Sequence, residues 1–217
     1  MLDLFGHPFS SYTQKVLIAL YENATGFNFR MLAPDHPENG AELARVWPPI
    51  TFPVLLDDGV PIIESSAIIE HLHLRHPGPV RLLPEAAAAA LDVRMLDRIF
   101  DNQLQSNFQW VVGDALRPPE RRDPIGVEER KARLEKAYVW LDRRMQGREW
   151  AAGDFSLADC AAAPALFYAD WTHPIDGRFS ALRAYRARLL ARPSYARAVD
   201  EARPYRPLFP LGAPDRD

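Results

Sequence analysis

The spacing of hydrophobic positions changes about one third of the way along the chain, and the two parts predict different structures. Up to His76, short apolar runs alternate between strand-like and helix-like segments. Leu2–Phe5 and Phe27–Leu32 are β-prone, and Lys15–Tyr21 between them is compact, apolar and free of glycine and proline. A strand, helix and strand in this order predict a parallel strand pair.

A hairpin and a helix are predicted next. Pro53–Leu56 and Pro61–Ile63 are apolar runs on either side of Asp57-Asp58-Gly59-Val60. An Asp-Gly pair between apolar runs is a strong hairpin signal, which adds antiparallel strands at one edge of the sheet. We expect Ser65 or Ser66 to cap a helix that ends near His76-Pro77. The predicted order is β-α-β, a long connection, then β-β-α.

The remainder of the chain predicts only helices. The apolar residues Leu134, Tyr138, Leu141 and Met145 follow one another at four, three and four positions, which marks one face of a helix. Ser156 with Asp159 resembles a capping box. The expected helices are Ala86–Val112, Val127–Met145, a segment starting after Ser156, Arg178–Ala191 and Ser194–Ala202. The proline-containing tail Pro204–Asp217 is expected to be an extended strap or a frayed end.

Composition excludes several classes of protein and locates the domain boundary. The net charge of −3 argues against general nucleic-acid binding, and one cysteine allows no disulfide. No apolar run could span a bilayer, and the N-terminus lacks a basic segment followed by an apolar one, so we expect a cytoplasmic protein without membrane contact. Proline is abundant, at 20 of 217 residues, and three prolines fall within 77–86. We therefore predict an α/β domain at 1–76, a linker at 77–86 and an all-helical domain at 87–217.

Two pairs of polar residues stand at predicted helix N-termini, where free backbone N–H groups and a partial positive charge stabilise anions. Ser10 and Ser11 precede the first helix, where a hydroxyl could donate to an oxyanion or a thiolate. Glu64 and Ser65 begin a later helix, where they could hold the ammonium and carboxylate of an amino-acid head group. Simple helix capping is the alternative interpretation of both pairs.

Proline follows Phe52 directly before a predicted strand. A cis Phe52–Pro53 bond would turn the Phe52 backbone toward a peptide-like ligand, although X-Pro bonds are mostly trans.

The histidines and the cysteine predict no metal site. His71, His73 and His76 share one predicted helix, but only His73 and His76 have the spacing of one helix face. No acidic residue or cysteine stands at a supporting spacing. Cys160 lies in an apolar run and is expected to be inert core.

Five segments together resemble the cytosolic glutathione S-transferases of the bacterial, serine type, over nearly the whole chain. They are Ser10-Ser11-Tyr12-Thr13-Gln14-Lys15-Val16, Phe52-Pro53-Val54-Leu55, Glu64-Ser65-Ser66-Ala67-Ile68-Ile69, Gly153-Asp154-Phe155-Ser156-Leu157-Ala158-Asp159 and Arg192-Pro193-Ser194-Tyr195. The resemblance implies a thioredoxin-like N-terminal domain, a helical C-terminal domain and a homodimer.

The resemblance also implies glutathione as co-substrate and assigns its contacts. Glutathione would place its γ-glutamyl group at Glu64 and Ser65, and its cysteinyl backbone at Phe52 beside a cis Pro53. Its thiol would meet Ser10, with Ser11 as the alternative hydroxyl. A small hydrophobic electrophile would lie near Phe9, Tyr12 and Trp110. His36 could contact glutathione, and Asp101 could contact it across a dimer.

One departure from the family pattern leaves more than one function open. Ile50 and Thr51 stand where the family often has glycine and a lysine that supports the glycyl carboxylate, which implies weaker or altered glutathione binding. The expected function is conjugation of the glutathione thiolate to an electrophile. The alternatives are a non-catalytic binding or interaction protein of the same fold and a glutathione-dependent isomerase, peroxidase or dehalogenase.

Overall fold

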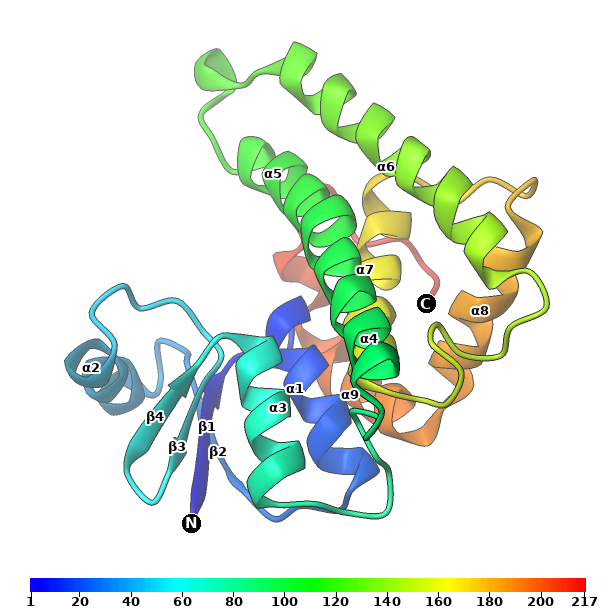
Figure 1. Cartoon of the computed structure of the whole chain (residues 1–217). Helices are drawn as coiled ribbons and strands as arrows, with labels where there is room; N and C mark the ends of the chain where they lie inside the picture. The colour runs from blue at the N-terminus through cyan, green and yellow to red at the C-terminus, as the bar shows by residue number, and fades with distance from the viewer.

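A four-stranded mixed sheet forms the centre of the N-terminal part in the computed structural model, which describes residues 1–217 (Figure 1). The strands are β1 (Leu2–Gly6), β2 (Asn28–Met31), β3 (Val54–Asp57) and β4 (Val60–Ile63), in the spatial order β2-β1-β3-β4. β1 pairs parallel with β2 and antiparallel with β3, and β3 pairs antiparallel with β4. The predicted parallel pair and antiparallel hairpin are confirmed.

The hairpin turn follows from its two central residues. Asp58 and Gly59 both have positive φ, at 48° and 82°, which is the backbone that a two-residue turn between twisted strands requires. The turn fixes the register in which Val54 faces Ile63 and Asp57 faces Val60.

Three helices accompany the sheet: α1 (Ser11–Glu22), α2 (Pro37–Val46) and α3 (Ser65–Arg75). The long connection expected before β3 contains α2, a helix that the sequence analysis did not predict. α2 is a short, mostly polar helix that buries only Asn39 and Leu43. Leu43 packs in a small hydrophobic cluster with sheet residues, and the Asn39 amide donates to the Met31 carbonyl and accepts from Arg30.

The C-terminal part is helical throughout, as predicted. A long first rod consists of α4 (Ala87–Ile99), the π-helical segment η1 (Phe100–Gln105) and α5 (Ser106–Ala115). The 3₁₀ turn η2 (Pro119–Arg121) leads into α6, and another 3₁₀ turn, η3, follows the last helix. These and the remaining elements are α6 (Pro124–Met145), α7 (Leu157–Thr172), α8 (Ser180–Ala191), α9 (Pro193–Ala202) and η3 (Arg203–Leu208).

α7 is the central helix of this part, and its N-terminus is capped as the sequence predicts. Every residue of α7 is buried, and the other helices surround it (Figure 1). Ser156 and Asp159 form the capping box, and Asp159 also accepts a hydrogen bond from the Tyr185 hydroxyl. None of the helices is long and apolar enough to cross a membrane.

The two parts share one hydrophobic core, because α1 packs on α3 on one side and on α7 and α9 on the other. The C-terminal tail is not frayed. After η3 it returns to α7, where Phe209 is buried and Arg216 pairs with Asp170. α1 is therefore the element through which the helical part fixes the loop at the end of β1.

Candidate functional site

Ser10 is the N-cap of α1 and lies half-buried at the end of the loop that follows β1. Its Oγ accepts a hydrogen bond from the Thr13 N–H at 3.3 Å, and its own N–H donates to the His7 carbonyl at 2.9 Å. Gly6 lets this loop close on the helix, because a Cβ there would come within 2.6 Å of the Thr13 side chain. Since Ser10 Oγ is the acceptor in the cap, its hydroxyl hydrogen remains available to an anion in front of the helix.

Ser11 and Tyr12 begin the helix and face different surroundings. Ser11 is buried, and its Oγ accepts from the Gln109 amide of α5 at 3.4 Å. Tyr12 is half-buried, and burial, followed by the negative charge of Asp101, raises the pKa of its phenol to about 12. Tyr12 therefore keeps its proton at neutral pH and can donate but does not act as a base.

Phe9 is held in place by α7. The Tyr168 hydroxyl donates to the Phe9 carbonyl at 3.0 Å and accepts from the Gln14 amide at 3.1 Å. The Phe9 ring meets Tyr168 edge-on at 5.5 Å and lies 6.4 Å from the Trp171 ring. This apolar wall stands beside the Ser10 loop, between the two parts of the chain.

The N-terminus of α3 differs from the expected cap. Neither Ser65 nor Ser66 caps the helix: the N-cap is Glu64, which makes no side-chain capping bond and has φ of 72°. A non-glycine residue at such a φ costs about 1–3 kcal/mol and is found mainly at functional sites. Glu64 is exposed and Ser65 is buried at the first helical position. The first N–H groups of α3 consequently lack a side-chain acceptor of their own and can meet a ligand carboxylate.

Ile50 to Pro53 forms the segment before β3. The Phe52–Pro53 bond is cis, as the resemblance implies, with Phe52 exposed and Pro53 buried. Ile50 is exposed and has φ of 57°, a backbone normally left to glycine, which is the residue that the family often has there. The Thr51 hydroxyl accepts from the Trp47 indole at 2.8 Å. No lysine is present in this segment to meet a carboxylate.

Asp101 belongs to a buried ion cluster between the two parts of the chain. Lys15 Nζ, which is fully buried, lies 2.6 Å from Asp97 Oδ1 and 2.8 Å from Asp101 Oδ2. The same Nζ donates to the Ser66 hydroxyl at 2.9 Å, and the half-exposed Arg98 contacts both carboxylates and Ser66. Burial raises the pKa of Asp101, while Lys15 acts in the opposite direction. Asp101 thus has partners within its own chain.

Two predicted contact residues lie in other surroundings. Trp110, on α5, packs against the start of α6, with the guanidinium groups of Arg117 and Arg130 5.7 and 5.3 Å from its ring. His36 is the N-cap of α2, half-exposed between the carboxylates of Asp35 and Glu38. The assignment of either residue to a ligand stays a prediction.

Sequence reasoning missed the residues that hold the site from the helical part. Tyr168 and Gln109 reach the Ser10 and Ser11 region from α7 and α5, and nothing in their local sequence marks them. Lys15 did carry a signal, since it is the only lysine before position 131 and stands within an apolar run.

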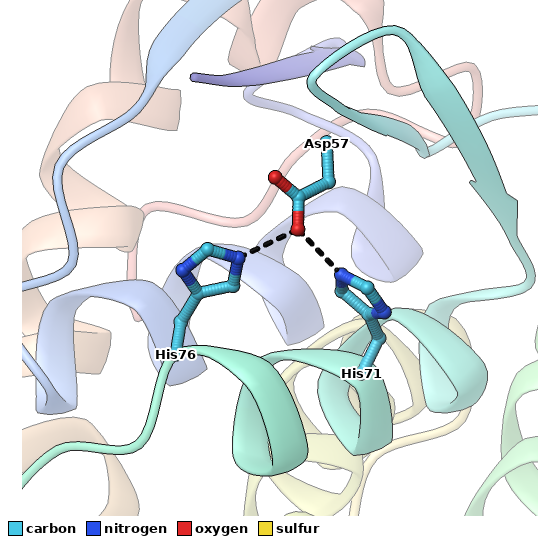
Figure 2. A group of neighbouring side chains, drawn as sticks. All are labelled: Asp57, His71 and His76. Carbon is cyan, nitrogen blue, oxygen red and sulfur yellow. Dashed lines mark hydrogen bonds and ion pairs between the residues drawn. The ribbon is translucent and has the colours of Figure 1, made fainter.

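A second cluster lies at the other end of α3. Asp57 Oδ2 is 2.8 Å from His71 Nε2 and 2.7 Å from His76 Nε2 (Figure 2). The expectation that His73 and His76 share a face was wrong, because His76 is the C-cap of α3 with φ of −133°, outside helical geometry. Its ring therefore turns toward His71 and Asp57. Cys160 is buried, as predicted, and burial raises the pKa of its thiol.

Comparisons with known proteins agree with the architecture. Residues 4–80 match the family model described as "Glutathione S-transferase, N-terminal domain", and residues 124–188 match "Glutathione S-transferase, C-terminal domain". Among curated proteins, the chain is 29% identical to a "Probable maleylacetoacetate isomerase" of Vibrio cholerae, over 94% of this chain and 97% of that protein. It is 27% identical to a "Stringent starvation protein A homolog" of Coxiella burnetii, over 77% of this chain and 75% of that protein.

A solved structure is similar over nearly its whole length. It is a glutathione S-transferase of Methylobacterium radiotolerans in complex with glutathione sulfonate, with 29% identity and a TM-score of 0.79. The match covers 91% of this chain and 94% of that one.

Proposed function

The chain belongs to the glutathione S-transferase family, and we propose that it conjugates the thiolate of glutathione to a small hydrophobic electrophile, with Ser10 activating the thiol. One observation carries the proposal: Ser10 caps α1 through its oxygen and keeps its hydroxyl hydrogen free at the positive end of that helix. Within it, residues 1–76 bind glutathione and residues 87–217 complete the pocket for the electrophile.

Glutathione would lie along the N-terminal part. Its α-carboxylate meets the uncapped N-terminus of α3 and the Ser65 hydroxyl, its ammonium meets the exposed Glu64 carboxylate, and its cysteinyl backbone lies beside Phe52. This arrangement sets the thiol in front of α1. The complex of the similar Methylobacterium protein with glutathione sulfonate supports this class of ligand.

The chemistry depends on the thiol pKa. A free thiol titrates at about 8.5, so only a few per cent is thiolate at pH 7. A hydroxyl donor and a helix N-terminus both stabilise the anion and lower that pKa. The sulfur then attacks the electrophilic carbon and forms a C–S bond. The bond from that carbon to the leaving group breaks, and the leaving group departs with its electron pair. Phe9 and the aromatic rings behind it offer the electrophile an apolar wall.

The proposal extends to assembly and location: a homodimer acting in the cytoplasm. Size-exclusion chromatography with light scattering measures the assembly, and a monomer at micromolar concentration would contradict it.

Three Ser10 and Ser11 variants test the mechanism. Ser10→Ala removes both the hydroxyl and the cap, and costs about 1 kcal/mol of stability, whereas Ser10→Gly removes the hydroxyl at only a few tenths of a kcal/mol. We expect both Ser10 variants to lower kcat/KM at least tenfold while glutathione binding, measured by calorimetry, is retained. Ser11→Ala is the matched control, with an expected change of less than threefold. If kcat/KM falls in proportion to the loss of stability in each variant, and not with the loss of the hydroxyl, Ser10 acts only as a helix cap.

A second function is favoured by Ile50 and Thr51. They replace the glycine and lysine that the family often has, and the Thr51 hydroxyl already accepts a hydrogen bond from the Trp47 indole. A protein that binds a partner or ligand on this fold without catalysis would show glutathione binding, or none, and no turnover. A panel of aryl halides, unsaturated carbonyl compounds, hydroperoxides and cis-trans isomerisable diacids distinguishes the two functions and the type of reaction.

A further inference from the structure

Three side chains converge at the end of the sheet that lies away from Ser10, and we propose that they form a binding site for a divalent transition metal ion, with Zn²⁺ as its expected occupant. The residues are Asp57, His71 and His76, and their potential ligand atoms all lie within 4.8 Å of one another. The proposal does not depend on the glutathione site or on the proposed reaction.

The geometry comes from two elements that the tertiary structure brings together. Asp57 is the last residue of β3, and α3 packs against β3 and β4 so that His71 faces the end of that strand. His76 reaches the same point because the helix ends there and its backbone leaves helical geometry. In Figure 2 the two imidazole rings point from α3 toward a single carboxylate oxygen of Asp57.

The spacing is close to what a zinc ion needs. Zinc lies about 2.0–2.2 Å from imidazole nitrogen and carboxylate oxygen, which puts tetrahedral ligand atoms about 3.4 Å apart. The Asp57 oxygen is 2.7 and 2.8 Å from the two Nε2 atoms, so each of these two pairs has to open by only about 0.6–0.7 Å around an ion. The ligand atoms of the two histidines lie within 4.8 Å of each other. Rotation of partly exposed side chains is sufficient for this change, because His71 and His76 are 24% and 33% exposed.

The donor set selects the type of ion. Two imidazole nitrogens and one carboxylate oxygen suit zinc and its neighbours, whereas magnesium and calcium prefer oxygen alone. A bound ion would replace the two hydrogen bonds between Asp57 Oδ2 and the Nε2 atoms of His71 and His76. A water molecule would complete the coordination as the fourth ligand.

His73 provides a matched control on the same helix. It lies between His71 and His76 in the sequence, is half-buried, and makes no hydrogen bond to Asp57. Replacing a histidine by glutamine preserves an N–H donor for Asp57 and removes the imidazole ligand. His71→Gln and His76→Gln therefore test the ligands without breaking the contact between α3 and β3, and His73→Gln controls for the loss of any histidine.

The experiment is a calorimetric titration of the tag-free, EDTA-treated full chain with Zn²⁺ alone, accompanied by thermal unfolding. We expect one zinc per chain and a rise in Tm of about 5–10 °C at a hundredfold excess over Kd. His71→Gln and His76→Gln should raise Kd at least about a hundredfold, and His73→Gln should leave it unchanged. Mg²⁺ should give no comparable signal.

Three results would overturn the proposal: no stoichiometric binding at about 0.1 mM free Zn²⁺, binding that survives in both ligand variants, or equal loss in His73→Gln. The cluster would then be a hydrogen-bonded link between β3 and α3 only. Thermal unfolding of the metal-free variants shows whether each has folded, so that a lost signal is assigned to the ligand.

Discussion

Replacing Lys15 is expected to cause a large loss of stability. Its ammonium is completely buried between Asp97 of α4 and Asp101 of η1, and it also donates to Ser66 of α3. It therefore links α1 to α3 and to the rod that α4 and η1 form. Lys15→Met keeps most of the volume of the side chain and removes the charge, the three short contacts and nothing else.

The magnitude follows from what the substitution leaves behind. Removing one partner of a buried ion pair costs about 3–5 kcal/mol because the other charge stays buried without a counterion. Here two carboxylates remain, but the half-exposed Arg98 still contacts both, at 2.7 Å from Asp97 and 2.8 Å from Asp101. Asp101, whose pKa burial already raises, can also take up a proton. We therefore expect Lys15→Met to lower the free energy of unfolding by about 3 kcal/mol, the lower end of that range. A folded domain has a free energy of unfolding of about 5–15 kcal/mol in total.

Urea unfolding at pH 7 measures this loss, and Lys131→Met is the matched control. Lys131 pairs with Glu128 at 3.0 Å on the surface, so the same substitution there should cost less than about 1 kcal/mol. Adding Asp101→Asn to Lys15→Met should restore at least about 1 kcal/mol, because it removes a stranded charge. If the two lysine variants differ by less than 1 kcal/mol, or if the double variant is less stable than Lys15→Met, the reasoning about the cluster is wrong.

Three further predictions concern the walls of the site. Tyr168→Phe should lower the free energy of unfolding by about 1–2 kcal/mol in urea titrations, because the Phe9 carbonyl loses its donor; an unchanged midpoint would contradict this. Burial lowers the pKa of His7 below 6.5, and His7 Nδ1 must be unprotonated to accept from the Phe9 N–H. The stability that His7 contributes is therefore present above pH 6.5 and is lost as the pH falls through the lowered pKa. His7→Asn should unfold without that step in a pH series of thermal melts. Glu64→Gln should raise the Kd for glutathione about tenfold in calorimetry, since a charge-assisted contact to the ammonium is lost; equal affinity would place the ammonium elsewhere.

Local pattern was sufficient for most elements of this chain. The Asp-Gly turn, the four strands, the buried face of α6 and the capping box of α7 all agree with the sequence because each depends on neighbours within a few positions. Ser10 at the start of α1 was also visible for this reason. α2 was not predicted; only two of its residues are buried, and one of them, Asn39, is polar and donates to Met31 of β2.

The chemistry of the two ends of α3 was decided by tertiary structure. Residues 71 and 76 do not share a face in a regular helix, and only the end of the helix and the packing of α3 on β3 bring them to Asp57. At the other end, the sequence suggested a serine cap, but Ser66 is taken by Lys15 and Arg98 from elements far along the chain. Sequence by itself thus determined the family fold and the position of Ser10 at the start of α1, because the motifs of the fold and a helix cap are local. The partners of each polar side chain depend on long-range packing, which only the folded chain specifies.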